Sequence, residues 1–280
     1  MMEGTRVLRL PSRSLVLDRC LVMGILNRTT DSFYDQGAYR RLDAAMDRVR
    51  RMIADGADIV DIGAERAGPG RAVPEQEEIA LVVETVERIR SESDVPLSVD
   101  TIKPEVARAA MTAGADIINS IGGMEAGMRK VAAQTGAAVV VMHIQGTPRV
   151  ANPTPVYRDV VGEVRSFLER RARECIAESI APDGIIIDPG PGFGKTAEHD
   201  RAIIRHLADF TALPYPVLLA ASRKGFIGDV LGNSPSDRLP GSLAVAAWGV
   251  MQGVRIIRTH DVTATLQACR MTEAVMNAQP

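Results

Sequence analysis

The sequence predicts an α/β fold, a single (β/α)₈ TIM barrel in which eight parallel strands alternate with eight helices. Eight short apolar runs alternate with segments that carry apolar residues at helical spacing. The runs are continuous rather than alternating, which is typical of strands buried on both faces of a parallel sheet. The 280 residues fit one barrel, which takes roughly 250 residues. Because no linker interrupts the alternation, residues 1–280 are expected to form one domain.

The strands are expected at residues 21–26, 59–63, 97–100, 117–119, 138–143, 185–188, 216–221 and 256–258. Five of them come shortly after a glycine, a residue that suits the left-handed position at the end of a helix. These glycines are Gly56, Gly114, Gly136, Gly184 and Gly253. Strict alternation with helices favours the barrel over the alternative, an open doubly wound sheet.

Eight helices are expected between and after these strands, each with apolar residues at helical spacing. They span residues 44–55, 75–91, 104–113, 123–134, 160–181, 197–208, 242–252 and 262–276. Before the first strand, residues 6–18 are typical of a short β-hairpin with a turn at Pro11 and Ser12. We expect the N-terminal segment 1–20 to cap the bottom of the barrel, where the strands begin.

Composition and charge exclude several classes of protein. The chain is 46% hydrophobic and 24% charged, which excludes a disordered or collagen-like chain. Thirty-three Lys and Arg against 35 Asp and Glu give a net charge of −2, so no nucleic-acid partner is expected. Three distant cysteines (Cys20, Cys175 and Cys269) are expected to be reduced, and no segment resembles a signal peptide or a membrane span. A cytoplasmic protein without a membrane partner is expected.

Polar residues follow every predicted strand, at the end where barrels of this type carry their chemistry. They are Asn27, Asp61, Asp100, Asn119, His143, Asp188, Ser222 with Lys224, and Arg258 with His260. One such residue alone could equally cap the next helix, but the complete ring predicts a site. The carboxylates suit a ligand with adjacent N–H groups, and the cations suit a phosphate. A Mg²⁺ ion carried by substrate phosphates would need only one or two protein oxygens.

Three loops are candidates for ligand contact. Residues 188–196 resemble a phosphate-binding P-loop but are one residue short of the motif. A loop that closely approaches a flat ligand is therefore favoured there. Residues 28–42 and 64–75 are rich in glycine and charge and are expected to act as lids, with ordinary surface loops as the alternative. A hydrolase is not favoured, because the sequence contains no GxSxG motif.

Taken together and in this order, the strand-end motifs resemble those of the dihydropteroate synthase family, folate-pathway enzymes targeted by sulfonamides. The resemblance runs from about residue 21 to about residue 276. The matching motifs are NRTTDSF (27–33), DIGAE (61–65), SVDT (98–101), IN (118–119), MH (142–143), DPGPGFGKT (188–196), SRK (222–224) and RTHD (258–261). The resemblance implies a pterin-binding barrel that forms a homodimer through its late helices.

The resemblance also implies a role for each matching position. Pterin contacts would come from Asp100, Asn119, Met142, Asp188, Phe193 and Lys224. The pyrophosphate would be bound by Asn27, Arg258 and His260, with Asn27 also touching Mg²⁺. The p-aminobenzoate site would include Phe33, Pro69, Ser222 and Lys224. The expected catalytic residues are Asp100, Asp188, Lys224, Arg258 and His260.

The implied reaction condenses 6-hydroxymethyl-7,8-dihydropterin diphosphate with p-aminobenzoate and releases pyrophosphate. Arg258, His260 and Mg²⁺ would neutralise the departing pyrophosphate. Asp100 and Asp188 would stabilise the cationic pterin that remains, and the aniline nitrogen would then attack it. No covalent nucleophile is required, which fits the lack of an activated Ser or Cys.

The part of the implied site that binds the second substrate departs from the family pattern. The first loop has Arg28 and Thr30 where the family has Val and Pro. The second loop has Ala67 and Gly68 where the family has Thr and Arg. Arg66 or Arg28 is a candidate for the missing cation, and the handling of p-aminobenzoate and sulfonamides is expected to differ.

Two alternatives to an active synthase stay open. A pterin-diphosphate-binding homologue without synthase activity is favoured by Ala67, Gly68 and Ser120, the last standing where the family has Asp. Homologues of that kind share the NRTxDSFY and AGPG patterns but degrade the DPG and SRK motifs, which this chain keeps. A methyltetrahydrofolate–corrinoid methyltransferase is disfavoured by Arg258 and His260, since its substrate has no pyrophosphate.

Overall fold

Eight parallel strands form a barrel in the computed structural model, which describes residues 7–28, 41–68, 70, 72–150, 152 and 154–279. The strands are β3 (Leu21–Asn27), β4 (Ile59–Gly63), β5 (Leu97–Asp100), β6 (Ile117–Ser120), β7 (Ala138–Met142), β8 (Ile185–Asp188), β9 (Leu218–Leu219) and β10 (Ile256–Thr259). They pair in the order β8-β7-β6-β5-β4-β3-β10-β9. The ring closes where Ile187 bridges Val217 and its N–H donates to the Pro216 carbonyl at 3.0 Å. The predicted (β/α)₈ barrel is confirmed.

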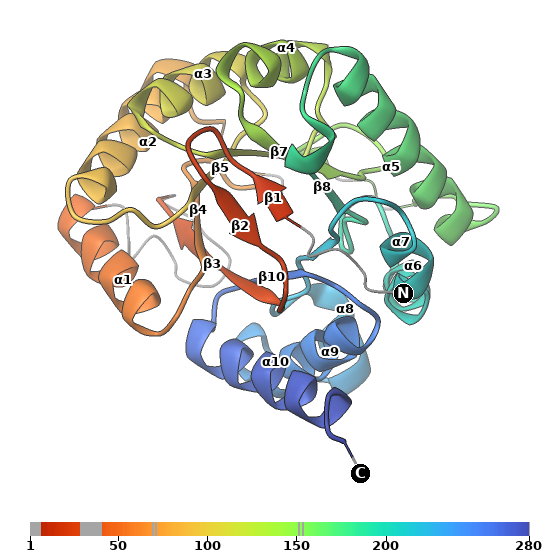
Figure 1. Ribbon diagram of the computed structural model, residues 1–280. Coiled ribbons are helices and arrows are strands. Elements are labelled where there is room, and N and C mark those ends of the chain that lie inside the picture. Colours follow the sequence, from red (N-terminus) through yellow and green to blue (C-terminus); the bar gives the residue numbers. More distant parts are fainter. Residues whose placement is uncertain are drawn as a thin grey trace.

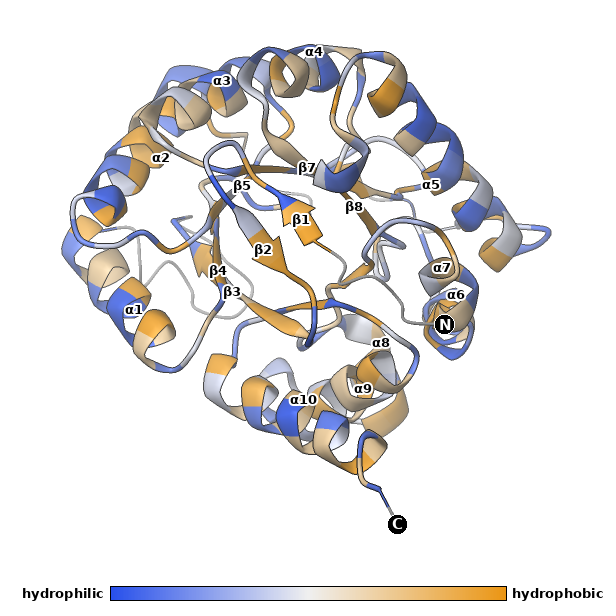
Figure 2. Ribbon diagram, viewed as in Figure 1, coloured by the Kyte–Doolittle hydropathy of each residue, from blue (hydrophilic) through white to orange (hydrophobic). Residues whose placement is uncertain are grey.

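Helices surround the strands on the outside (Figure 1). They are α1 (Leu42–Ala54), α2 (Glu75–Arg90), α3 (Pro104–Ala113), α4 (Ala126–Thr135), α5 (Val160–Ala177), α6 (Ala197–Arg205), α7 (Leu207–Thr211), α8 (Gly225–Leu231), α9 (Leu239–Met251) and α10 (Val262–Met276). Figure 2 shows mostly apolar strands inside helices of mixed polarity. Among the described residues, no helix has the length and apolar character needed to cross a membrane.

Successive residues of each strand point alternately into the barrel and out towards the helices. In β3, Met23 belongs to the interior core, whereas Val22 belongs to the outer core with Val49 of α1. In β10, Ile256 is interior and Ile257 is exterior. The same alternation, continued to the carboxyl ends of the strands, turns polar side chains inward. These are Asp61, Asp100, Asn119, Asp188 and Arg258.

An antiparallel hairpin of β1 (Val7–Arg9) and β2 (Ser14–Val16) lies across one end of the barrel (Figure 1). Leu8, Leu10 and Leu17 are buried in the same core as the first interior residues of the strands. The hairpin therefore packs against the end of the barrel where the strands begin. The opposite end, where the polar side chains gather, stays accessible.

Several helix boundaries differ from the sequence prediction by one to three residues, and three differences are larger. The predicted helix 197–208 is divided into α6 and α7, and the helix predicted over 160–181 ends earlier, before Ser179 with its φ of 73°. The sequence does not predict α8, because two of its residues are glycines with low helix propensity. A Cβ on Gly228 would lie 2.3 Å from the Arg238 guanidinium, so a larger residue there would displace that side chain.

Candidate active site

A pocket of about 250 Å³ opens at the carboxyl ends of the strands. Residues predicted from the sequence line it: Asn27, Asp100, Asn119, Met142, Asp188, Phe193, Lys224, Arg258 and His260. Two further predicted residues, Phe33 and Pro69, lie outside the described residues. Ser222 does not line the pocket but contacts His260 from behind. The fold thus brings most of the predicted residues together in one cavity.

Arg258 lies at the base of the pocket between two carboxylates. Its guanidinium donates to Asp61 at 2.6 Å and to Asp100 at 3.1 Å. The amide nitrogen of Asn119 lies 3.3 Å from both carboxylate oxygens of Asp61. Burial disfavours the charge on Arg258, but Asp61 and Asp100 outweigh burial and raise its pKa. Arg258 is therefore a permanent cation that is held from two sides.

The other charged groups of the pocket have shifted pKa values. Burial raises the pKa of Asp100 to about 7, although Arg258 opposes the shift. Burial also raises the pKa of Asp188, against the charge of Lys224 and a 2.7 Å hydrogen bond from the Gly190 N–H. Burial lowers the pKa of Lys224 to about 8, opposed by Asp188. Opposite shifts of this kind within one cavity are typical of functional sites.

Lys224, Phe193 and Met142 form part of the pocket wall. The Lys224 ammonium lies 4.4 Å from the centroid of the Phe193 ring and donates to the Pro191 carbonyl. Gly192, with a φ of 82°, permits this approach, because a Cβ there would lie 3.1 Å from the Lys224 side chain. An aromatic ring and a thioether in one wall suit a flat ligand.

His260 follows β10 and lines the pocket in its neutral form. Burial and the neighbouring Arg258 lower the pKa of His260 to about 3. The Ser222 hydroxyl lies 2.9 Å from His260 Nδ1 and also accepts a hydrogen bond from the His260 backbone N–H at 3.2 Å. The Ser222 hydroxyl can therefore donate a hydrogen bond to Nδ1. In that tautomer the neutral ring carries its own proton on Nε2. The expectation of a cation at His260 is corrected: the ring offers an N–H donor.

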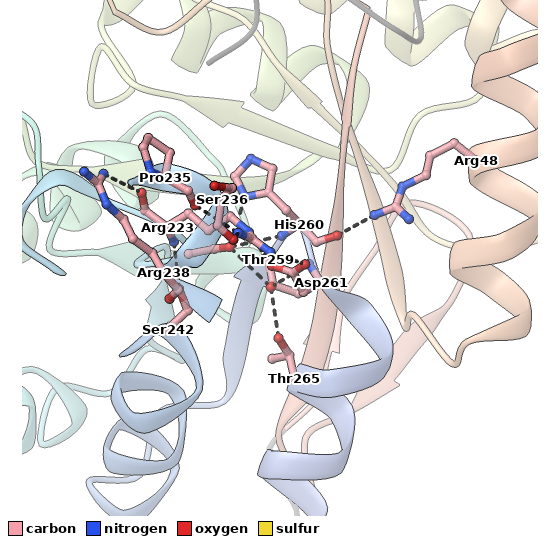
Figure 3. Close-up of polar contacts among 11 residues, drawn as sticks. Arg48, Arg223, Pro235, Ser236, Arg238, Ser242, Thr259, His260, Asp261 and Thr265 are labelled. Carbon is pink, nitrogen blue, oxygen red and sulfur yellow. Dashed lines mark hydrogen bonds and ion pairs between the residues drawn. The ribbon is translucent and has the colours of Figure 1, made fainter. Parts of the chain in front are cut away.

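A cluster of hydrogen bonds behind His260 fixes the segments that carry the cations of the pocket (Figure 3). Arg223 makes two contacts with the Asp261 carboxylate, at 2.8 and 2.9 Å. Arg223 has a φ of 56°, and its side chain is buried while its neighbour Lys224 enters the pocket. Figure 3 also shows Arg48 of α1 donating to the His260 carbonyl. The sequence prediction missed Arg223 and Asp261, although both stand within matched motifs.

The second loop, residues 64–68, is held against the pocket by Glu65. The Glu65 carboxylate pairs with Arg149 at 2.6 Å and with Lys103 at 3.3 Å. Arg149 also donates to the backbone carbonyl of Arg66 at 3.2 Å. Arg66 and the two residues after it line the pocket. A buried ion pair thus fixes the backbone of the loop that supplies this wall.

Of the two candidate substitutes for the missing cation, only one reaches the pocket. Arg28 is 2% exposed, and its guanidinium donates to the Thr85 hydroxyl at 2.7 Å and lies 3.3 Å from Glu84. Both partners belong to α2, on the outside of the barrel. The hypothesis that Arg28 replaces the cation is therefore wrong, whereas Arg66 remains a candidate.

Besides Ser222, two members of the predicted polar ring lie behind the pocket. Asp61 is fully buried and accepts the hydrogen bond from Arg258. His143 follows Met142 and faces the other side of the chain, where its Nδ1 lies 2.9 Å from the Lys195 ammonium. Because side chains alternate along a strand, Met142 and His143 cannot both face the interior.

The fold and the pocket define a (β/α)₈-barrel enzyme with a buried, mixed-charge site for a flat small molecule. The model of the family described as pterin binding enzyme matches residues 23–260. The chain belongs to this family, as its motifs predict.

Relatives and solved structures match nearly the whole chain. The chain is 45% identical over 269 residues to "Dihydropteroate synthase" of Escherichia coli K12, which covers 95% of each chain. It is 39% identical over 275 residues to "Inactive dihydropteroate synthase 2" of Mycobacterium leprae, covering 96% of this chain and 94% of the relative. The crystal structure of Yersinia pestis dihydropteroate synthase with a sulfonamide drug is similar with a TM-score of 0.93 and 40% identity, covering 98% and 100% of the two chains.

Proposed function

We propose that the protein is a dihydropteroate synthase. This transferase joins 6-hydroxymethyl-7,8-dihydropterin diphosphate to p-aminobenzoate and releases pyrophosphate. The observation that carries the proposal is the convergence of Asp100, Asp188, Lys224 and Arg258 in one buried pocket. The carboxylates accept hydrogen bonds from the N–H groups of a pterin, and the cations face an anionic leaving group.

The pterin ring is placed by its polar edge and by its two faces. Asp100 and Asp188 accept from ring N–H groups, and Lys224 donates to a ring acceptor. Phe193 and Met142 cover the faces. Hydrogen bonds from the pterin favour the ionised carboxylates, which lowers the raised pKa values of Asp100 and Asp188 when the substrate binds.

The reaction replaces a carbon–oxygen bond by a carbon–nitrogen bond. The bond between the pterin methylene carbon and the diphosphate oxygen breaks, and pyrophosphate leaves with the electron pair. Arg258 and the neutral His260 ring stabilise the leaving group through charge and an N–H donor. The carboxylates of Asp100 and Asp188 stabilise positive charge on the pterin. The aniline nitrogen then forms the new bond and releases one proton to solvent.

We further propose that Mg²⁺ enters with the diphosphate and touches Asn27. The side chain of Asn27 lines the pocket at the end of β3. An amide oxygen is a type of ligand that Mg²⁺ accepts in proteins. Among the described residues, no group of three or more His, Cys, Asp and Glu could hold a metal. Diphosphate oxygens would therefore supply most ligands, and the ion would neutralise charge on the leaving group.

The principal alternative is a homologue that binds the pterin diphosphate without synthase activity. Ala67 and Gly68 favour it, because they alter the wall that the second loop supplies. Ser120 carries little weight, since it is buried and does not line the pocket. A methyltetrahydrofolate–corrinoid methyltransferase is disfavoured by Arg258 at the base of the pocket, because its substrate has no diphosphate to bind.

An assay of pyrophosphate release with the pterin diphosphate, Mg²⁺ and p-aminobenzoate tests the proposal. We expect release that requires all three components and is inhibited by a sulfonamide. Tight binding of the pterin diphosphate without release on addition of p-aminobenzoate would identify the binding homologue. A protein that does not bind the pterin diphosphate would contradict both functions.

Replacing Arg66 by alanine is expected to raise the KM for p-aminobenzoate about 10-fold, because a charge-assisted hydrogen bond to its carboxylate is lost. The KM for the pterin diphosphate is expected to change much less. Steady-state kinetics with each substrate varied in turn measure both values. Arg66 is chosen because it lines the pocket on the second loop, next to Gly68.

The double variant Arg66→Ser with Gly68→Arg is the matched control for Arg66→Ala. It returns the cation to the position of the family pattern. Among the described residues, the atom nearest to a Cβ at Gly68 is Nε of Arg66, at 3.6 Å. We expect it to recover most of the affinity for p-aminobenzoate. Equal changes in both KM values for Arg66→Ala would show that Arg66 does not select the second substrate.

We propose that the protein forms a homodimer through α8 and α9. Val230, Leu231 and Trp248 are 60%, 51% and 38% exposed, and they line an apolar groove of about 420 Å³. The Trp248 ring is fixed by a hydrogen bond from its N–H to the Ile204 carbonyl at 2.8 Å. A fixed aromatic ring in an exposed apolar groove is typical of an interface.

Replacing Leu231 by aspartate is expected to convert the dimer into a monomer, because a charge would be buried in the interface. Light scattering coupled to size-exclusion chromatography measures the mass. The control is Val16→Asp, on the exposed hairpin strand β2, where the residue is 48% exposed; this variant is expected to stay dimeric. A monomeric wild-type protein would contradict the proposed homodimer.

We also propose a cytoplasmic protein that works on small molecules, without nucleic-acid or membrane partners. Cys20, Cys175 and Cys269 are free and buried, which fits a reducing compartment. The net charge of −2 offers no basic surface to a polyanion.

A further inference from the structure

The loop after β8 lies directly on the backbone that follows β7. A Cβ at Gly190 would lie 2.1 Å from the His143 carbonyl oxygen, and one at Gly194 would lie 2.1 Å from the Gln145 carbonyl oxygen. Both glycines have positive φ angles, of 63° and 57°. Only glycine fits at these two points. The two glycines therefore allow the loop to lie against the backbone after β7. Other groups must hold the loop in that position.

Lys195 extends into the centre of this loop and not into the pocket. Its ammonium lies 2.9 Å from the Gly190 carbonyl oxygen, 3.1 Å from that of Phe193 and 3.2 Å from that of His143. The fourth neighbour is Nδ1 of the His143 ring, at 2.9 Å. Lys195 is absent from the pocket lining. The lysine that makes this segment resemble a phosphate-binding loop thus binds the loop's own backbone.

The contacts of Lys195 require its charged form. Burial lowers the pKa of His143 to about 3, so the neutral ring acts as an acceptor at Nδ1. All four neighbours of Lys195 are then acceptors, and an ammonium has three N–H groups where a neutral amine has two. Burial lowers the pKa of Lys195 to about 7, opposed by Asp200 and Asp188 and reinforced by Lys224.

Two residues held by Lys195 contact side chains that line the ligand pocket. The Gly190 N–H donates to Asp188 at 2.7 Å, and the Phe193 ring packs against the Lys224 ammonium. We infer that Lys195 is a positioning residue that fixes the Gly190 and Phe193 carbonyls and thereby orients Asp188 and the Phe193 ring for the pterin. The inference rests on the proposed function, because it takes the pterin diphosphate as the ligand of this pocket.

Replacing Lys195 by methionine is expected to raise the Kd for the pterin diphosphate about 10-fold at about pH 6. Calorimetric titration without p-aminobenzoate measures the affinity and the stoichiometry together. We expect the variant to bind with the same stoichiometry as the wild type, because it stays folded and only the loop after β8 is poorly placed. The KM for p-aminobenzoate is expected to change less than twofold, roughly the scatter of surface substitutions.

The pH dependence distinguishes positioning from general stabilisation. The difference in Kd between the wild type and Lys195→Met is expected to shrink from about pH 6 to about pH 8.5, as Lys195 loses its proton. Asp188, Asp200, His143 and Lys224 face Lys195, and the charge of Lys195 lowers the pKa values of the first three. The difference in Kd therefore reports Lys195 together with its effect on these neighbours. A difference that does not vary with pH would overturn the inference.

Two further variants make the test decisive. Lys130→Met, at an exposed position on α4, is expected to leave the Kd unchanged. Lys195→Gln keeps N–H donors without the charge and is expected to give a Kd between those of the wild type and Lys195→Met. If Lys195→Met does not fold, Lys195→Gln takes its place in the test. Wild-type affinity in the Lys195 variants would overturn the inference, whereas a wild type that does not bind the pterin diphosphate would contradict the proposed function.

Discussion

Replacing Arg258 by methionine is expected to lower kcat/KM for pyrophosphate release about 1000-fold, a loss of the size seen when a charge-stabilising donor is removed. Arg258 is the cation at the base of the pocket, and its guanidinium stabilises negative charge as pyrophosphate leaves. The assay of pyrophosphate release measures the loss. Arg258→Lys keeps the charge but not the planar fork, so it is expected to be intermediate.

The same substitution is expected to lower the free energy of unfolding by about 3–5 kcal/mol, because it leaves a buried carboxylate unpaired. Asp61 is fully buried and lies 2.6 Å from the Arg258 guanidinium. The double variant Arg258→Met with Asp61→Asn removes both charges and is expected to regain most of that stability. Denaturant unfolding measures stability in each variant.

The double variant separates the two roles of Arg258. Stability is expected to return without turnover, because the neutral pair no longer stabilises a departing anion. Recovery of both properties would show that Arg258 acts in turnover only by holding the fold, and would contradict its assignment to the pyrophosphate.

The residues that line the pocket could be predicted because strand geometry is regular. In β5 and β8 the last residues, Asp100 and Asp188, face inward, and a polar residue at the carboxyl end of a barrel strand indicates a site. The sequence motifs then supplied the chemistry. This information is local, since each prediction needs only the end of one strand.

The side chains that the sequence prediction misplaced or missed are oriented by partners far away in the sequence. His143 adjoins an interior residue and so turns outward to Lys195, a partner on another loop. Arg28 turns to α2, and Arg223 turns to Asp261 after the last strand. No local pattern states which partner a charged side chain will find. The neutral state of His260 could not be predicted either, because it follows from burial beside Arg258.

Replacing Lys224 by alanine is expected to weaken binding of the pterin diphosphate about 100-fold, through loss of a buried charged donor and its effect on a neighbour. The Lys224 ammonium contacts the Phe193 ring, and its charge opposes the burial that raises the pKa of Asp188. Without Lys224 the pKa of Asp188 rises further. The carboxyl then stays protonated up to a higher pH than in the wild type, and while protonated it is a poorer acceptor for a pterin N–H.

The direction of the pH dependence tests this coupling between Lys224 and Asp188. A carboxyl with a raised pKa is ionised only at higher pH, so the affinity of Lys224→Ala is expected to recover as pH rises through the new pKa of Asp188. The wild type is expected to lose affinity from about pH 7, where Lys195 becomes neutral, and further above about pH 8, where Lys224 becomes neutral, because their pKa values are about 7 and about 8. Asp100 also interacts with the charge of Lys224, so its ionisation contributes to the difference between the two curves.

Calorimetric titration across the pH range gives both affinity curves, and Lys130→Ala is the control for removing a lysine charge at an exposed site. Lys224→Met separates charge from packing, since it keeps an apolar chain beside Phe193 but cannot support Asp188. It is expected to follow the pH curve of Lys224→Ala with higher affinity throughout. If neither variant regained affinity as the pH rises, Lys224 would act on the pterin through its own hydrogen bond alone, and the coupling to Asp188 would be contradicted.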